Sequence, residues 1–355
     1  MQSTDPIEQL EDENNLKKYV KAGEILSNVL DKLVEAAKPG IEVYDLCIMG
    51  DRLINEESQN SYPEIAFKGI CFPTCISKNN IAGNFSPIAK GEKILEGDLL
   101  KIELGCAIDG FPAQIGYTLI VKEDDKTVIN PKIVNVMMAT SEASKKIFKM
   151  MKPGTTNFQI REILELYAKR YDCRLPYTEN DTLAPGLISY QMSKNIIDGF
   201  NDEEDEFAHK IIISKENTNY PFKMIKSEFE ENEVYCIDVM FTSGTGKMNK
   251  SDAETTIFRR LNENFYPLKL KASKDCLSKF GKGSNFPINV REYVNNSSSF
   301  RFGLKDCLNK DLIEEYPVYQ EKKGEYIART KFTVIVRSEP ILITGRSAEE
   351  QLEKL

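Results

Sequence analysis

The stretch that decides the fold is residues 98–121, which read DLLKIELGCAIDGFPAQIGYTLIV. Two mostly apolar runs flank the pair Asp109-Gly110, and an Asp-Gly pair in this setting is the strongest short-range signal of a β-hairpin. The sequence therefore predicts a buried strand over residues 98–105, a turn at Asp109-Gly110 and a returning strand over residues 111–121.

Helical patterns lie on both sides of this hairpin. Apolar residues recur at a spacing of three to four positions, which is typical of amphipathic helices. These predicted helices cover residues 16–37, 43–56, 132–151 and 157–171. Further strands are predicted at residues 233–242, 253–259 and 326–336, and Gly244 and Gly246 predict a second hairpin between the first two of them. This order of elements predicts an α+β protein whose two similar halves join near residue 130 and share one sheet.

The composition is that of a globular protein and excludes several classes. Hydrophobic residues make up 41% of the 355, which excludes a mainly disordered chain, and the net charge of −8 excludes a protein that is basic all over. His209 is the single histidine and none of the eight cysteines forms a CxxC pair, so a zinc finger is excluded. We read the cysteines as small buried hydrophobic residues in a reducing compartment. Neither a signal peptide nor a transmembrane run is visible, and we expect a soluble intracellular protein.

Three blocks of sequence carry a family resemblance. They are FPTCISKNN at residues 72–80, LLKIELG at residues 99–105 with the DGF of residues 109–111, and EVYCID at residues 233–238. In this order the blocks resemble those of the proliferation-associated (ErbB-binding) protein family, a non-peptidase relative of the type 2 methionine aminopeptidases.

The resemblance covers residues 16–346 and implies a pita-bread fold, in which two pseudo-symmetric α/β halves surround a curved central sheet. The halves would cover about residues 16–130 and 131–346, with a type 2-like insertion at about residues 260–315. Residues 1–15 would form a flexible acidic N-terminus, and residues 347–355 a C-terminal end.

The aminopeptidases hold two divalent metal ions with two aspartates, one histidine and two glutamates, and the resemblance places these positions in this sequence. The aspartate positions match Glu103 and Gln114. The histidine position matches Tyr190. The glutamate positions match Asp238 and Lys331.

The chemistry of these side chains argues against a metal site. Four carboxylates and a neutral imidazole balance two divalent ions, whereas these five positions carry a formal charge of −1 in this sequence. A protonated lysine offers no lone pair to a metal. Two further histidines assist turnover in the aminopeptidases, and their positions match Asn84 and Asp198, which leaves no imidazole base. We therefore expect no catalytic residue, no metal and no cofactor, and we predict that Lys331 lies close to Glu103, Asp238 or both.

A basic segment favours a binding function instead. Between Arg259 and Lys282, seven cations stand against two acids in a chain of net charge −8. Such cations can neutralise phosphates, and the neighbouring aromatics Phe265, Tyr266 and Phe280 could stack on unpaired bases. The candidate RNA-contacting and ribosome-contacting side chains are Arg259, Arg260, Lys269, Lys271, Lys274, Lys279 and Lys282.

The resemblance implies a catalytically inactive protein that binds ribosomal RNA and the large ribosomal subunit, with roles in ribosome biogenesis, translation or growth regulation. It implies a cytoplasmic protein that also acts in the nucleus or nucleolus, and we expect a monomer with no membrane partner. Members often end in a lysine-rich tail. Gln351–Leu355 carries no polybasic run, which argues against RNA binding or nuclear targeting through such a tail. Two alternatives stay open: an aminopeptidase with an atypical single-metal site, and a protein–protein adaptor whose former substrate pocket, lined by Glu103, Tyr190 and Asp238, holds a peptide.

Overall fold

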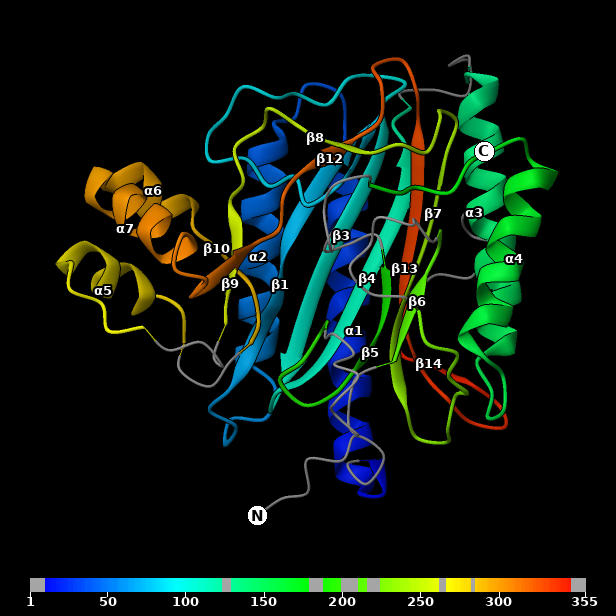
Figure 1. Cartoon of the computed structure of the whole chain (residues 1–355), viewed down its shortest axis with the longest axis horizontal. Helices are drawn as coiled ribbons and strands as arrows, with labels where there is room; N and C mark the ends of the chain where they lie inside the picture. The colour runs from blue at the N-terminus through cyan, green and yellow to red at the C-terminus, as the bar shows by residue number, and fades with distance from the viewer. Residues whose placement is uncertain are drawn as a thin grey trace.

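The computed structural model describes residues 10–122, 129–178, 188–198, 210–215, 224–261, 266–281 and 285–345. Within these residues, eight strands form one sheet in the order β1-β3-β4-β13-β7-β5-β6, with β14 paired to β13 (Figure 1). The strands are β1 (Lys68–Lys78), β3 (Leu99–Ile108), β4 (Phe111–Ile120), β13 (Ile327–Ile335), β7 (Val234–Thr242), β5 (Ile188–Met192), β6 (Ile211–Ile213) and β14 (Ile341–Leu342). In this sheet, β4 from the first half of the chain therefore lies directly beside β13 from the second half.

The hairpin at the centre of this sheet is the one that the sequence predicted. β3 and β4 pair antiparallel over their whole length, from Leu99 opposite Ile120 to Ile108 opposite Phe111. At the turn between them, the φ angles are 54° at Asp109 and 81° at Gly110. Two consecutive positive φ angles are what a two-residue type I′ turn requires, and Asp-Gly is a preferred pair for it.

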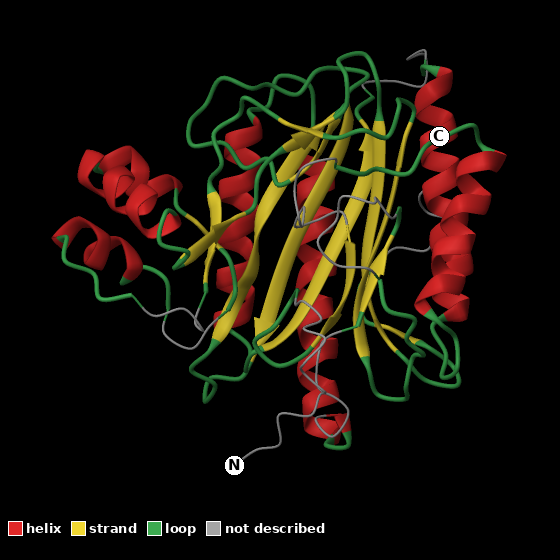
Figure 2. Ribbon diagram, viewed as in Figure 1, coloured by secondary structure: helices red, strands yellow, loops and turns green. Residues whose placement is uncertain are grey.

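Helices cover one face of the sheet (Figure 1, Figure 2). α1 (Glu13–Ala36) and α2 (Val43–Gln59) pack on β1, β3 and β4, whereas α3 (Pro131–Met150) and α4 (Asn157–Arg170) pack on β13, β7 and β6. Each of these helices matches one predicted from its apolar spacing.

The alternation of side chains along the strands decides which residues face away from these helices. Ile102 and Leu104 of β3 enter the core that contains α1 and α2, and Ile237 of β7 enters the core that contains α3 and α4. Because successive side chains on a strand point to opposite faces, Glu103 and Asp238 turn to the other face. The charged residues at the positions that match the aminopeptidase metal ligands therefore lie apart from the two main cores.

α1 begins earlier than predicted. The side chain of Asp12 accepts a hydrogen bond of 2.9 Å from the backbone N–H of Asn14, so it caps the helix at Glu13 rather than at Leu16. Leu10 is already buried. The expected flexible N-terminus therefore does not include residues 10–15, and residues 1–9 lie outside the described residues.

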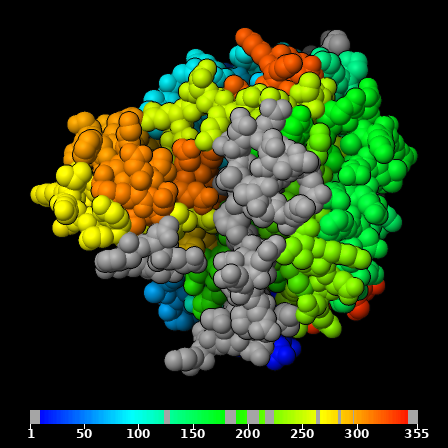
Figure 3. Space-filling model, viewed as in Figure 1, coloured from blue at the N-terminus to red at the C-terminus, as the bar shows by residue number. Residues whose placement is uncertain are grey.

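The insertion has a small core of its own. Its strands form a sheet of order β10-β9-β11, and Phe258, Phe280 and Phe300 lie in the core beside it. The insertion projects from the side of the body opposite α3 and α4 (Figure 1, Figure 3). Its elements are β9 (Ile257–Arg260), α5 (Lys271–Leu277), β10 (Ile288–Asn289), α6 (Arg291–Asn296), α7 (Ser298–Leu308) and β11 (Ile313–Glu315).

The second predicted hairpin is wrong. β7 pairs with β13 and β5 in the main sheet, whereas β9 belongs to the insertion. Between them lies β8 (Asn249–Lys250), which joins β12 (Tyr319–Gln320) and β2 (Ile81–Gly83) in a third sheet. Gly246 has a φ of 90°, and a Cβ there would lie 2.5 Å from the carbonyl oxygen of Leu175. This glycine therefore lets the chain pass tightly over a neighbouring loop, and does not reverse it into a hairpin.

The burial of the cysteines is as predicted, since all eight are buried free thiols. Within the described ranges, no helix combines the length and the apolar character needed to cross a bilayer. The single histidine, His209, falls in residues 199–209, which lie outside the description.

Candidate functional site

Three charged side chains lie in one row across the centre of the sheet. Glu103 of β3 lies opposite Gly116 of β4, Gly116 lies opposite Lys331 of β13, and Lys331 lies opposite Asp238 of β7. Residues directly opposite each other on neighbouring strands project to the same face, so the three side chains converge. Gly116 allows this close approach, because a Cβ there would lie 2.6 Å from the Cβ of Lys331.

Lys331 is placed as the sequence predicted. Its Nζ lies 3.1 Å from Oε1 of Glu103 and 3.8 Å from Oδ2 of Asp238. Burial and the neighbouring charge of Arg329 act to lower the pKa of Lys331, but the two carboxylates outweigh both and raise its pKa above the ordinary value. The amine is therefore held as an ammonium ion between two carboxylates.

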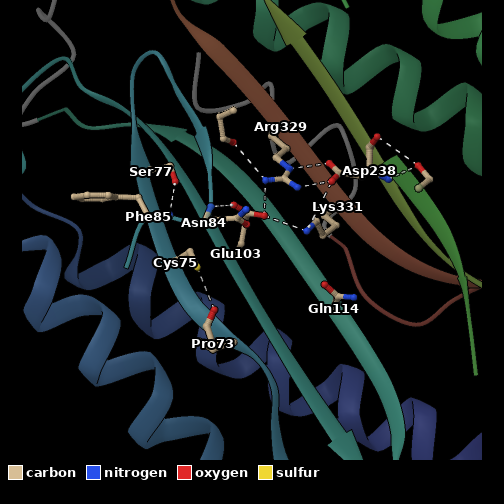
Figure 4. Close-up of polar contacts among 12 residues, drawn as sticks. Pro73, Cys75, Ser77, Asn84, Phe85, Glu103, Gln114, Asp238, Arg329 and Lys331 are labelled. Atoms are coloured by element: carbon tan, nitrogen blue, oxygen red, sulfur yellow. Dashed lines mark hydrogen bonds and ion pairs between the residues drawn. The ribbon is translucent and has the colours of Figure 1, made fainter. Parts of the chain in front are cut away.

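Arg329 is the functional residue that sequence reasoning missed. It lies two positions before Lys331 on β13, so it projects to the same face, and Figure 4 shows it between Glu103 and Asp238. Its Nε lies 2.8 Å from Oδ1 of Asp238 and its Nη2 2.5 Å from Oδ2, a bidentate pair. Its Nη1 lies 2.6 Å from Oε1 of Glu103. Burial opposes the charge of Arg329, but these two carboxylates raise its pKa further.

The four side chains form a neutral ionic cluster. Two cations face two carboxylates, and none of the four side chains is more than 6% exposed. Burial acts to raise the pKa of Glu103, but Arg329 and then Lys331 lower it below the ordinary glutamate value. Buried charges persist only where they are paired in this way. We call Glu103, Asp238, Arg329 and Lys331 the central cluster.

The other two metal-ligand positions, Gln114 and Tyr190, do not join the central cluster. The side-chain Nε2 of Gln114 lies 3.7 Å from Sδ of Met192, and the backbone carbonyl oxygen of Gln114 accepts a hydrogen bond of 3.0 Å from the hydroxyl of Thr333. Tyr190 is buried and lies opposite Cys236, two positions along β7 from Asp238. Burial raises the pKa of Tyr190 well above the ordinary value, so it remains a neutral phenol.

The two lost histidine positions have different surroundings. Asn84 lies beside the central cluster, with a backbone N–H that donates to Oε2 of Glu103 at 3.4 Å. The side chain of Asp198 is bound by other partners, since it accepts a hydrogen bond of 2.6 Å from the hydroxyl of Tyr316 and is paired with Arg259. Neither side chain is an acid or base aimed at the central cluster.

The residues present do not fit the two divalent metal ions that the fold family implies. Arg329 and Lys331 already bind the carboxylate oxygens of Glu103 and Asp238 that a metal would need. Two cations also repel a third at the same place. In the part of the chain that the structure describes, no three histidine, cysteine, aspartate or glutamate side chains gather in an arrangement able to hold a metal ion.

The basic residues of the insertion divide into buried and exposed groups. Lys269, Lys271, Lys274 and Lys279 are exposed, and Arg260 is partly exposed. In the described stretch 266–281 the single acidic side chain is Asp275. We call Arg260, Lys269, Lys271, Lys274 and Lys279 the cationic face. Lys282 lies outside the described residues, as does Phe265, and Phe280 is buried, which leaves Tyr266 as the exposed aromatic of the three predicted.

Arg259 is a correction to the predicted set, because it is buried and already paired. Its Nη2 lies 2.6 Å from Oε2 of Glu314, and its Nη1 is paired with Asp198, so both carboxylates hold its guanidinium. Its guanidinium carbon also lies 6.0 Å from the ring centre of Tyr316. Composition alone counted Arg259 among the exposed cations, but β9 turns it inward. The ion pair between Arg259 and Asp198 thereby connects the insertion to the body of the protein.

Replacing Arg259 with methionine should lower the free energy of unfolding by about 2–3 kcal/mol, because two partly buried carboxylates would lose their cation. The measurement is urea-induced unfolding of both proteins. The exposed Lys271 provides the control, since its replacement with methionine should change the free energy by no more than about 0.5 kcal/mol. Equal effects of the two changes would show that Arg259 is not a structural link.

Fold and site together define the class of protein: a pita-bread protein of the metallopeptidase type with an ionic cluster at the metal position. The model of metallopeptidase family M24 matches residues 17–180. A solved structure of a thermophilic Arx1 is 25% identical, covers 94% of this chain and 91% of that chain, and superposes with a TM-score of 0.79. The methionine aminopeptidase of Rickettsia prowazekii, at 13% identity and a TM-score of 0.58, shares the fold.

Curated relatives identify the branch within this class. "ERBB-3 BINDING PROTEIN 1" of Solanum tuberosum is 36% identical over 325 residues, which are 90% of this chain and 78% of the relative. "Curved DNA-binding protein" of Schizosaccharomyces pombe is 32% identical over 352 residues, which are 96% of this chain and 86% of the relative. The chain belongs to the family of ErbB-3-binding and proliferation-associated proteins.

Proposed function

We propose that this protein is a catalytically inactive member of the aminopeptidase fold that binds RNA and the large ribosomal subunit through the cationic face of its insertion. The observation that carries the proposal is that Lys269, Lys271, Lys274 and Lys279, close together in the sequence, are all exposed on an insertion that projects from a chain of net charge −8. Exposed cations at one place bind phosphates through the release of condensed counterions.

Two further observations support this proposal. The central cluster occupies the metal position with side chains of its own, which removes the metal-activated water that the aminopeptidase reaction needs. One relative at 32% identity carries the name of a DNA-binding protein, and contacts to phosphates are common to DNA and RNA recognition. By contrast, Glu103 and Asp238 are neutralised within the protein, so a peptide held by these carboxylates has less support.

Charge reversal of the cationic face tests the binding. Changing Lys269, Lys271 and Lys274 together to glutamate should weaken binding to a structured RNA roughly tenfold or more at physiological salt. In a plot of the logarithm of affinity against the logarithm of salt concentration, the slope should become less steep by about two to three. The fold should be unchanged, because exposed charges contribute little to stability. The measurements are fluorescence titration of an RNA hairpin at several salt concentrations and co-sedimentation with large ribosomal subunits.

A matched control lies on the opposite side of the molecule. Lys146, Lys149 and Lys169 are exposed on α3 and α4, so their change to glutamate alters the net charge equally but away from the insertion. This variant should keep nearly all of the RNA affinity. Equal losses in both triple variants, or undiminished co-sedimentation of the first one, would remove the cationic face from the proposal. Duplex DNA as competitor separates RNA recognition from general phosphate binding.

The inactive part of the proposal has its own test. Purified protein given Mn²⁺, Co²⁺ or Zn²⁺ should release no N-terminal methionine from a short peptide. Release of methionine with stoichiometric metal binding would favour the aminopeptidase instead.

We also propose that the protein acts in the cytoplasm and additionally in the nucleus, which imaging of a fluorescently tagged chain can check.

A further inference from the structure

Two cysteine thiols of the insertion are in contact with each other. The side chains of Cys276 of α5 and Cys307 of α7 lie close enough for each thiol to shift the pKa of the other. Both are buried in the core of the insertion. All eight cysteines of the chain lie in its described part and are free thiols.

The packing of α5 against α7 brings these two sulfur atoms together. Gly303 lies one helical turn before Cys307 on α7. A Cβ at Gly303 would lie 3.1 Å from the Cβ of Cys276 and 2.3 Å from the carbonyl oxygen of Ala272. The absence of a side chain at this position therefore lets the two helices approach closely at the level of the cysteines.

Polar contacts hold this approach in register. The hydroxyl of Ser273 on α5 donates to Oδ2 of Asp306 on α7 at 2.5 Å. The thiol of Cys307 lies 3.5 Å from the carbonyl oxygen of Ser273. The two sulfur atoms are thus positioned by contacts on both helices, not by chance proximity of two loops.

We propose that Cys276 and Cys307 form a reversible disulfide that staples α5 to α7 when the protein is exposed to hydrogen peroxide. First, the sulfur of one of the two cysteines attacks one oxygen of the peroxide, the O–O bond breaks, and that cysteine becomes a sulfenic acid as one water leaves. The sulfur of the other cysteine then attacks the sulfenic sulfur, the S–O bond breaks, and a second water leaves. Two thiols lose two electrons and two protons, and the peroxide is reduced to two waters. Thiol reductants reverse the bond by exchange.

The two thiols influence each other's acidity. The neighbouring thiol of Cys276 lowers the pKa of Cys307, with Lys310 and Arg260 adding to this effect and burial and Asp306 opposing it. Because the thiolate is the reactive form, this interaction favours reaction of one sulfur of the pair with peroxide, and the other sulfur then completes the disulfide.

Buried thiols react only when the structure opens locally, and α5 is an element that can open. It is seven residues long and has no side-chain hydrogen bond at its N-cap, and short helices have little stability of their own. The other six cysteines lie with the two main cores, which open only at a higher free energy. Peroxide should therefore select the pair in the insertion.

The staple has a structural consequence that does not depend on the proposed function. α5 carries Lys271 and Lys274, both exposed. Trypsin cleaves after a helical lysine only when the helix unfolds locally. A disulfide that holds α5 against α7 should therefore protect these two sites.

Peptide mapping without reductant tests the proposal on the full chain. After brief treatment with hydrogen peroxide, the map should contain one cross-linked peptide pair joining Cys276 to Cys307, with the loss of two hydrogen atoms and recovery by dithiothreitol. Cleavage by trypsin after Lys274 should become slower by several fold. The variant Cys276→Ser should show no cross-link and no protection, whereas Cys173→Ser should behave as the parent does.

Three results would overturn the staple. In the first, peroxide oxidises no thiol although the protein stays folded. In the second, Cys307 is oxidised to a sulfinic acid without a cross-link. In the third, the cross-link joins other cysteines. Should Cys276→Ser fail to fold, the map of the parent protein still decides, because it identifies the joined cysteines directly.

Discussion

Replacing Arg329 with leucine is expected to lower the free energy of unfolding by about 3–5 kcal/mol at neutral pH. Arg329 binds both Asp238 and Glu103 in a fully buried position. Its removal would leave two buried carboxylates that share the single ammonium of Lys331, and a carboxylate without a cation is costly to bury. Urea-induced unfolding of the variant and the parent measures this loss.

The loss should depend on pH, with a sign that follows from the cluster. In the parent, the folded-state pKa of Glu103 is lowered, so its pairing stabilises the fold above the ordinary glutamate pKa, and this contribution disappears as the pH falls. In the variant, burial without Arg329 should raise carboxylate pKa values, so that protonation relieves the penalty in acid. The deficit should therefore be largest near pH 7 and shrink toward about pH 5.

An exposed arginine provides the control for this prediction. Arg52 on α2 is paired with Glu56 at 2.8 Å, with both side chains more than half exposed, and such pairs contribute at most about 0.5 kcal/mol. Changing Arg52 to leucine should have an effect of that size and little dependence on pH. A loss no larger than this for Arg329→Leu, or a loss equal at both pH values, would refute the role given to the central cluster.

Replacing Lys331 with glutamate should lower the free energy of unfolding by about 2–4 kcal/mol and should create no metal site. The change places three carboxylates around one guanidinium, and at least one of them should take up a proton to relieve repulsion. Arg329 would still hold Asp238 and Glu103, and Gln114 is still directed to Met192. The carboxylates of Glu103 and Asp238 would therefore remain engaged by Arg329, and no free set of donors for a pair of divalent ions would appear.

Calorimetric titration with Mn²⁺ and unfolding in urea check this prediction together. Lys331→Met is the matched variant, because it removes the ammonium without adding a carboxylate, and its loss should be smaller, about 1–3 kcal/mol. Stoichiometric Mn²⁺ binding by Lys331→Glu would contradict the view that Arg329 closes the site. Equal stability of the two variants would show that repulsion among carboxylates has no measurable cost there.

Much of the main body could be predicted because its signals are local. The hairpin of residues 98–121 depends on Asp109-Gly110 and the apolar runs beside it, all within one short stretch. The helices α1 to α4 follow from apolar residues at helical spacing. The placement of Lys331 near carboxylates could also be predicted, because a buried ammonium requires a partner.

Other features could not be predicted because they depend on contacts between distant segments. Gly244 and Gly246 have the composition of a hairpin turn, but β7 and β9 belong to different sheets. Arg259 has the same charge as its exposed neighbours, and only the position of Asp198 and Glu314 shows that it is buried and paired. Composition counts charges, whereas burial depends on what packs over them.

The α+β class, the central hairpin and the basic segment of residues 259–282 follow from the residues themselves, and the family resemblance adds the expected loss of the metal ligands. What occupies the metal position depends on the folded chain. Arg329 matches none of the ligand positions, and it enters the central cluster because the register of β13 against β7 places Lys331 opposite Asp238, with Arg329 two residues away on the same face. The pairing of two carboxylates with two cations from strands far apart in the chain is a property of this register. The local sequence encodes each strand, but the electrostatic balance at the site arises only when the strands are aligned.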